Sequence, residues 1–168
     1  MADTIYYLPG FGGQLGTGLG EALLSRGFAV TGRETVGVFR EMAFGDQVCT
    51  VAEDLTTQFW HEDARVIANS FGAYLFLHAQ AQMKPYPGKV LLLSPIVGSF
   101  SDDHTMRTFM PPRPRKLFEL VESGTYPAPL NCEIHVGSED WQAIPDHVCR
   151  LAASLSVKAT VVPGGGHM

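Results

Sequence analysis

The sequence is short of charged residues, and of basic ones in particular. Only 17% of its 168 residues are charged, and 12 Lys and Arg against 17 Asp and Glu give a formal net charge of −5. Because phosphate backbones are bound by net basic surfaces, this balance argues against a nucleic-acid partner. No stretch approaches the roughly 20 apolar residues that cross a bilayer, and no basic segment opens the chain. We therefore expect a soluble, cytoplasmic protein with no membrane partner.

Cysteine is also scarce, with Cys49, Cys132 and Cys149 forming an odd set without close pairing. This pattern favours reduced thiols over a disulfide framework and agrees with a cytoplasmic location. Histidines lie near two of these cysteines, in the pairs Cys132 with His135 and His147 with Cys149. Residues three apart on a strand or two apart on a helix do not converge, so we expect no metal site.

The content of hydrophobic residues is ordinary, at 45%. A chain of this length buries about 70% of its unfolded surface on folding, enough for one core. No internal repeat or composition shift marks a second domain. We therefore predict a single domain over residues 1–168.

Short apolar runs alternate with segments of helical periodicity. The runs occupy residues 4–8, 28–31, 65–68, 89–94, 132–136 and 157–162. Their apolar character predicts strands buried on both faces, and the apolar stripes at 48–59 and 148–155 predict helices between them. This alternation indicates an α/β domain whose mostly parallel sheet carries its ligand site beyond the carboxyl ends of the strands. The irregular, proline-rich segment 96–130 is predicted to form a short lid or cap over that site.

Four segments that follow predicted strands carry residues suited to acyl transfer. The first is Ala68-Asn69-Ser70-Phe71-Gly72, where small residues flank a serine between a strand and a helix. A strained turn of this kind exposes the serine hydroxyl and needs small neighbours. The other segments are Leu8-Pro9-Gly10-Phe11-Gly12-Gly13, Gly137-Ser138-Glu139-Asp140 and Pro163-Gly164-Gly165-Gly166-His167.

In this order, the four segments resemble the nucleophile elbow, oxyanion loop, acid segment and histidine loop of the α/β-hydrolase superfamily. The resemblance implies a three-layer sandwich with a mostly parallel central sheet. It implies Ser70 as nucleophile, His167 as base and Asp140 as the acid that orients it. The backbone N–H groups of Phe11 and Phe71 would bind the oxyanion, and no cofactor is implied.

The sequence departs from the family pattern at several points. Ala68 stands where the elbow usually has glycine, and Pro9 where the oxyanion loop has histidine. Only Met168 follows His167, so we do not expect the helix that usually buttresses this loop. Glu139 competes with Asp140 for the role of the acid, and the pair at 102–103 is a weaker candidate. The histidines outside any motif are expected on the surface or fully hydrogen-bonded; they are His61, His78 and His104.

Three functions remain open at this point. The first is a serine hydrolase that cleaves a small carboxylic ester or thioester through an acyl-enzyme. The second is a non-catalytic binding protein of the same fold, because fold alone does not fix function. The third is a dinucleotide-binding oxidoreductase, suggested by the glycines of 10–20 with Glu34 as a ribose ligand, although Leu15 occupies the third glycine position of that motif. The substrate and the oligomeric state are left open.

Overall fold

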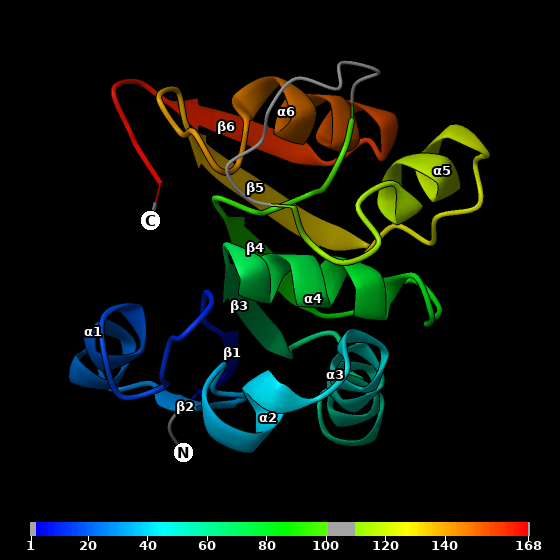
Figure 1. Cartoon of the computed structure of the whole chain (residues 1–168). Coiled ribbons are helices and arrows are strands. Elements are labelled where there is room, and N and C mark those ends of the chain that lie inside the picture. Colours follow the sequence, from blue (N-terminus) through cyan, green and yellow to red (C-terminus); the bar gives the residue numbers. More distant parts are fainter. Residues whose placement is uncertain (1–2, 101–109, 168) are drawn as a thin grey trace.

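A six-stranded parallel sheet forms the middle of the computed structural model, which describes residues 3–100 and 110–167 (Figure 1). The strand order is β2-β1-β3-β4-β5-β6, and every pair of neighbours is parallel. The strands are β1 (Thr4–Leu8), β2 (Ala29–Gly32), β3 (Arg65–Asn69), β4 (Lys89–Leu93), β5 (Asn131–Gly137) and β6 (Lys158–Val162). The prediction of an α/β fold with a parallel sheet is confirmed.

Helices occupy both sides of the sheet, which gives the predicted three layers. They are α1 (Leu19–Ser25), α2 (Gly37–Glu41), α3 (Phe44–Gln58), α4 (Phe71–Gln80), α5 (Lys116–Glu122) and α6 (Pro145–Ser154). Buried side chains of α3, α4, α5 and α6 share one core cluster with alternate residues of β1, β3, β4 and β5, whereas α1 packs against Ile5 and Tyr7 on the opposite face. Figure 1 shows α4 crossing in front of the middle of the sheet.

The two faces of the sheet are unequally buried. Val66, Val90 and Leu92 face the larger helical layer and are buried, whereas Ile67 and Leu91 point to the other side and are only half-buried. The prediction that the strands are buried on both faces is therefore wrong for the middle of the sheet. The reason is that α1 packs beside β1 and β2, and no described helix continues that layer over β3, β4 and β5.

A buried polar network joins α3 to the edge of the sheet. The Tyr6 hydroxyl donates to the Asp54 carboxylate at 2.7 Å, and Arg33 donates two bonds to the same carboxylate, each at 2.7 Å. Burial, followed by the hydrogen bond to Asp54, raises the pKa of Tyr6 well above its usual range. Paired in this way, the buried charge is satisfied, and the network fixes β1 and β2 against α3.

The segment predicted as a lid contributes to the core in the parts that are described. Leu117 on α5 is fully buried, and the Tyr126 hydroxyl donates to the carbonyl oxygen of Leu77 at 2.7 Å. Residues 101–109 of this segment lie outside the described residues, so the lid stays a prediction.

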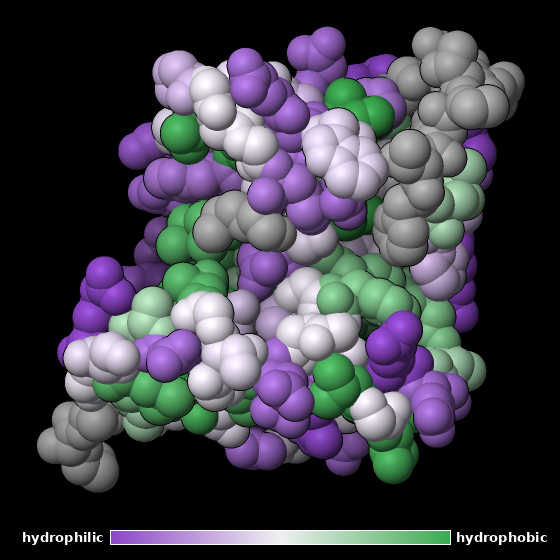
Figure 2. Space-filling model, turned by 60° about the vertical axis from the view of Figure 1, so that its left-hand side comes forward, coloured by the Kyte–Doolittle hydropathy of each residue, from purple (hydrophilic) through white to green (hydrophobic). Residues whose placement is uncertain are grey.

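Apolar residues are also exposed on the surface of the protein. On the face shown in Figure 2, hydrophobic residues form separate patches among hydrophilic ones. Within residues 3–100 and 110–167, none of the helices has the length and hydropathy required to span a membrane.

Candidate active site

Ser70 lies in a strained turn at the carboxyl end of β3. Its φ of 52° and ψ of −120° are unusual for a residue with a side chain, and such a conformation costs about 1–3 kcal/mol. The Ser70 N–H donates to the carbonyl oxygen of Leu93 at 3.0 Å, which holds the turn against β4. A Cβ at Gly72 would lie 2.1 Å from the carbonyl oxygen of Leu8, so this position admits only glycine. The backbone geometry thus explains why the residue two positions after the serine, Gly72, is glycine.

Ser70, His167 and Asp140 come together although they lie far apart in the sequence. The Ser70 hydroxyl oxygen is 2.8 Å from Nε2 of His167. Nδ1 of the same imidazole is 3.0 Å from each carboxylate oxygen of Asp140. The side chain of Asp140 is fully buried and that of His167 is 12% exposed, so water screens their interaction only weakly.

The Asp140 carboxylate is fixed by the chain that follows it. Its Oδ1 accepts the N–H of Gln142 at 2.9 Å and the N–H of Ala143 at 2.8 Å. The competing acid Glu139 is exposed, and its recorded bond is from its backbone N–H to the carbonyl oxygen of Gly165. Of the two candidate acids, the structure therefore places Asp140 on His167. The weaker candidates Asp102 and Asp103 lie outside the described residues.

The loop that carries His167 is fastened to the loop that carries Asp140. The Ser138 hydroxyl accepts the N–H of Gly164 at 2.8 Å, and the Ser138 N–H donates to the carbonyl oxygen of Val162 at 2.9 Å. A Cβ at Gly137 would lie 2.1 Å from the carbonyl oxygen of Gly165, so the two loops touch through backbone. These contacts hold the histidine loop beside the loop that carries Asp140.

The two residues expected to bind an oxyanion through their N–H groups both lie close to Ser70. Phe71 is the first residue of α4, where a backbone N–H has no intrahelical acceptor. Gly10 lies against Ser70, since a Cβ there would be 3.3 Å from the serine Cβ, and Phe11 follows it. The rings of Phe11 and Phe71 meet edge to face with centroids 5.8 Å apart. No hydrogen bond within residues 3–100 and 110–167 is recorded from either N–H.

Thr35 holds the oxyanion loop in place and was not singled out from the sequence. It is 1% exposed, and its hydroxyl donates to the carbonyl oxygen of Gly10 and accepts the N–H of Gly13 at 3.0 Å. The Thr35 carbonyl oxygen accepts the N–H of Gly12 at 3.1 Å, and the Thr35 N–H donates to the carbonyl oxygen of Gly13 at 3.0 Å. A lone threonine after a short strand carries no motif, so no sequence signal marks this residue.

A small cavity of about 270 Å³ opens beside the serine. Its lining residues are Phe11, Ser70, Phe71, Ile96 and Gln142. Ile96 and Gln142 were not predicted, because each lies in a loop and reaches the cavity only through the fold. The cavity walls are mainly apolar, and its volume suits a small organic group.

The residues suggested for a metal or a nucleotide do not assemble a site. Among the described residues, no three His, Cys, Asp or Glu side chains lie close enough together to hold a metal ion. Glu34, considered as a ribose ligand, instead accepts the backbone N–H of Leu15 at 3.1 Å.

Comparison with known proteins identifies the fold. Protein-family models and curated protein sequences give no match. Among solved structures, one from work on carboxylesterases of Nitrososphaera gargenis matches with a TM-score of 0.65 and 14% identity, covering 99% of this chain and 83% of that one. The ydeN gene product of B. subtilis matches with a TM-score of 0.65 and 15% identity, covering 99% and 88%.

A monoacylglycerol lipase of Paleococcus ferrophilus matches with a TM-score of 0.57 and 15% identity, covering 98% of this chain and 86% of that one. The protein therefore has the α/β-hydrolase fold, in agreement with the resemblance seen in its sequence. Its structural neighbours include esterases and a lipase, and their low identity extends the likeness to the fold alone.

Proposed function

We propose that this protein is a serine hydrolase that cleaves a small carboxylic ester or thioester through an acyl-enzyme. The observation that carries the proposal is the chain of contacts from the Ser70 hydroxyl to His167 and on to the buried Asp140. A serine hydroxyl is a weak nucleophile by itself, and an adjacent base activates it.

Each group has one task in this reaction. His167 takes the hydroxyl proton at Nε2 as Ser70 attacks the substrate carbonyl, and then gives that proton to the leaving alcohol or thiol. Asp140 holds the imidazole with its proton on Nδ1 and stabilises the imidazolium that forms. The N–H groups of Phe11 and Phe71 receive the developing oxyanion. Water then attacks the acyl-enzyme with His167 again as base, which frees Ser70 and releases the acid.

The cavity beside Ser70 supports a preference for small substrates. At about 270 Å³ it lies just below the usual volume range of about 300–1,000 Å³ for ligand sites. Its apolar walls of Phe11, Phe71 and Ile96 suit a short acyl chain, while Gln142 adds a polar side chain to the lining. The proposed mechanism uses no cofactor.

Labelling by a fluorophosphonate probe tests the proposal, because the probe reports an activated serine without knowledge of the substrate. We expect the wild type to be labelled and the Ser70→Ala and His167→Ala variants to lose labelling. Ser123→Ala and His61→Ala, which change an exposed serine and an exposed histidine, serve as matched controls and should label like the wild type. A correctly folded wild type without labelling would overturn the proposal and favour the non-catalytic binding protein.

A further inference from the structure

An arginine lies against the rings that line the cavity beside Ser70. Phe11 and Phe71 line this cavity, and 58% of Phe11 is exposed. The guanidinium carbon of Arg40, on α2, lies 4.2 Å from the centroid of the Phe11 ring. A cation over a ring at this distance is attracted by the negative face of the ring. Arg40 is thus held beside the cavity by an aromatic residue of the site itself.

A second arginine lies farther along the same rings. The ring centroids of Phe71 and Phe44 are 6.2 Å apart, and the guanidinium carbon of Arg113 lies 5.7 Å from the centroid of Phe44. A Cβ at Gly45 would lie 3.1 Å from Nη2 of Arg113, so the glycine leaves room for this guanidinium. With Phe11, these two rings form a row that we call the aromatic wall. A cation lies at each end of it.

The two guanidinium groups have no acceptor within residues 3–100 and 110–167. No hydrogen bond or ion pair is recorded there for the side chain of Arg40 or of Arg113, and both residues are exposed. The other arginines of these ranges are each paired with a carboxylate or carbonyl oxygen: Arg26, Arg33, Arg65, Arg115 and Arg150. Arg115 and Arg150 also lie over a ring, that of Phe118, so stacking does not prevent pairing. Unpaired arginines are thus confined to the aromatic wall among the described residues.

Unpaired guanidinium groups at the edge of a cavity favour an anionic substrate. The chain has a net charge of −5, and the carboxylate nearest the serine, Asp140, is fully buried against His167. The exposed cations of the aromatic wall therefore attract negative charge to a protein that otherwise repels it. A guanidinium presents a planar fork of donors that matches a carboxylate, and stacking on a ring leaves the edge of that fork open.

We propose that the substrate is a half-ester or half-thioester of a short dicarboxylic acid, and that Arg40 binds its free carboxylate. The methylene groups between the two carbonyl carbons lie in the cavity against Phe11 and Phe71, and Arg113 adds positive charge along the aromatic wall. Hydrolysis consumes one water, breaks the bond between the acyl carbon and the alcohol or thiol, and yields the dicarboxylate, the alcohol or thiol and a proton. The inference rests on the proposed hydrolysis at Ser70 and specifies its substrate class.

Two ethyl esters of equal acyl length test the inference on the full chain. Monoethyl succinate carries a carboxylate where ethyl butyrate carries a methyl group, so the ratio of their kcat/KM values isolates the effect of the charge. We expect the wild type to prefer monoethyl succinate about tenfold, the factor typical of a hydrogen bond to a charged group. Arg40→Gln should remove this preference. Arg40→Lys, which keeps the charge without the fork, should retain part of it.

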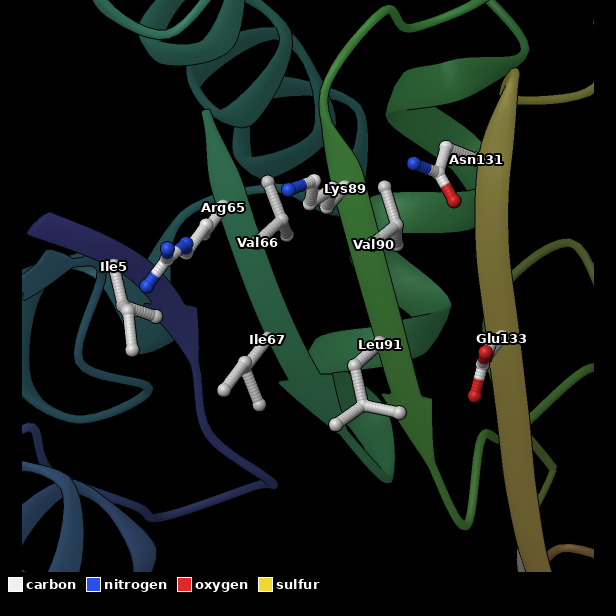
Figure 3. A pocket seen from close by; sticks show the side chains of 9 residues that line it. All are labelled: Ile5, Arg65, Val66, Ile67, Lys89, Val90, Leu91, Asn131 and Glu133. Atoms are coloured by element: carbon white, nitrogen blue, oxygen red, sulfur yellow. The ribbon is translucent and has the colours of Figure 1, made fainter. Parts of the chain in front are cut away.

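Lys89→Gln is the matched control for loss of charge alone. Figure 3 shows Lys89 at the amino end of β4, whereas Ser70 follows the carboxyl end of the neighbouring β3. This exposed lysine is far enough from the site for its charge to be screened, so the ratio should stay within about twofold of the wild type. Arg113→Gln, which acts one ring farther from the cavity, should lower the ratio less than Arg40→Gln does.

Fluorophosphonate labelling separates this inference from the proposed function. A wild type that is labelled at Ser70 and hydrolyses ethyl butyrate, yet shows no preference for monoethyl succinate, would overturn the inference and leave the proposed hydrolysis standing. A folded wild type without labelling would overturn both. A preference that survives Arg40→Gln, or that Lys89→Gln also removes, would overturn the assignment of the carboxylate to Arg40.

Discussion

The Asp140 carboxylate reaches His167 because the chain after β5 turns back at Gly137 and buries one of two adjacent acids. We predict that Asp140→Asn lowers kcat for ester hydrolysis by roughly 10³–10⁴-fold, because the amide does not stabilise the imidazolium and favours the wrong tautomer. Glu139→Gln is the matched control and should leave kcat within about twofold of the wild type, since this side chain is exposed. Steady-state kinetics with 4-nitrophenyl acetate measures both variants. An Asp140→Asn enzyme of normal activity would contradict the proposed role.

At this scale, sequence reasoning pointed to residues that lie together in the structure where a motif carried them. Ser70 and His167 were predicted because glycines around each match a known turn, and the structure brings the pair to 2.8 Å. The resemblance favoured Asp140, and Glu139 stayed a competitor because the direction of each side chain depends on the conformation of the turn. Thr35 gave no signal, since its role arises from a loop that approaches it from 22 residues away.

At the scale of elements, the oxyanion loop depends on the segment that follows β2. We predict that Thr35→Val lowers kcat about 10–100-fold with little change in KM, because loosening the loop weakens donors that act only in the transition state. Thr35→Ser keeps the hydroxyl and should restore most of the rate. Initial-rate kinetics on both variants, with thermal melts as a check on folding, test this expectation. A rise in KM at constant kcat would instead assign Thr35 to substrate binding.

The elements themselves were predictable where their apolar pattern is strong. All six predicted strands occur, and their bounds differ from the expected ones by few residues, because apolar runs between turn residues leave little choice. The short helices α1 and α2 were not predicted, since each is held by packing beside the sheet rather than by a long apolar stripe. The prediction of two buried faces was wrong because half-buried residues such as Ile67 and Leu91 look the same in sequence as fully buried ones.

At the scale of the whole molecule, the larger helical layer supports the loops that carry the candidate site. The carboxyl ends of β3, β5 and β6 must bring three loops within hydrogen-bond distance, and the layer containing α3, α4 and α6 supplies the rigid support. This relation follows from the parallel topology and was not readable from any single motif.

The same helical layer contains His78, which was expected on the surface or fully hydrogen-bonded and is neither. It is 3% exposed, packs against Phe44 and Tyr74, and has no hydrogen-bond partner at Nε2. Burial, with the nearby charges of Arg113 and Lys116, lowers its pKa from 6.5 to about 4. The folded protein thus keeps His78 neutral at pH values where the unfolded chain protonates it.

The stability of the whole fold should therefore fall as the pH drops from about 6.5 to about 4. A pKa lowered in the folded state contributes stability that is fully present above pH 6.5, and linkage puts the loss from this group at about 3 kcal/mol by pH 4. His78→Phe removes the titrating group and should flatten this part of the profile. Urea unfolding at pH 7, 6, 5 and 4 measures the free energy of unfolding of both proteins. His61→Phe, which changes an exposed histidine, controls for the loss of a histidine as such. Parallel profiles for wild type and His78→Phe would show that other groups set the acid sensitivity.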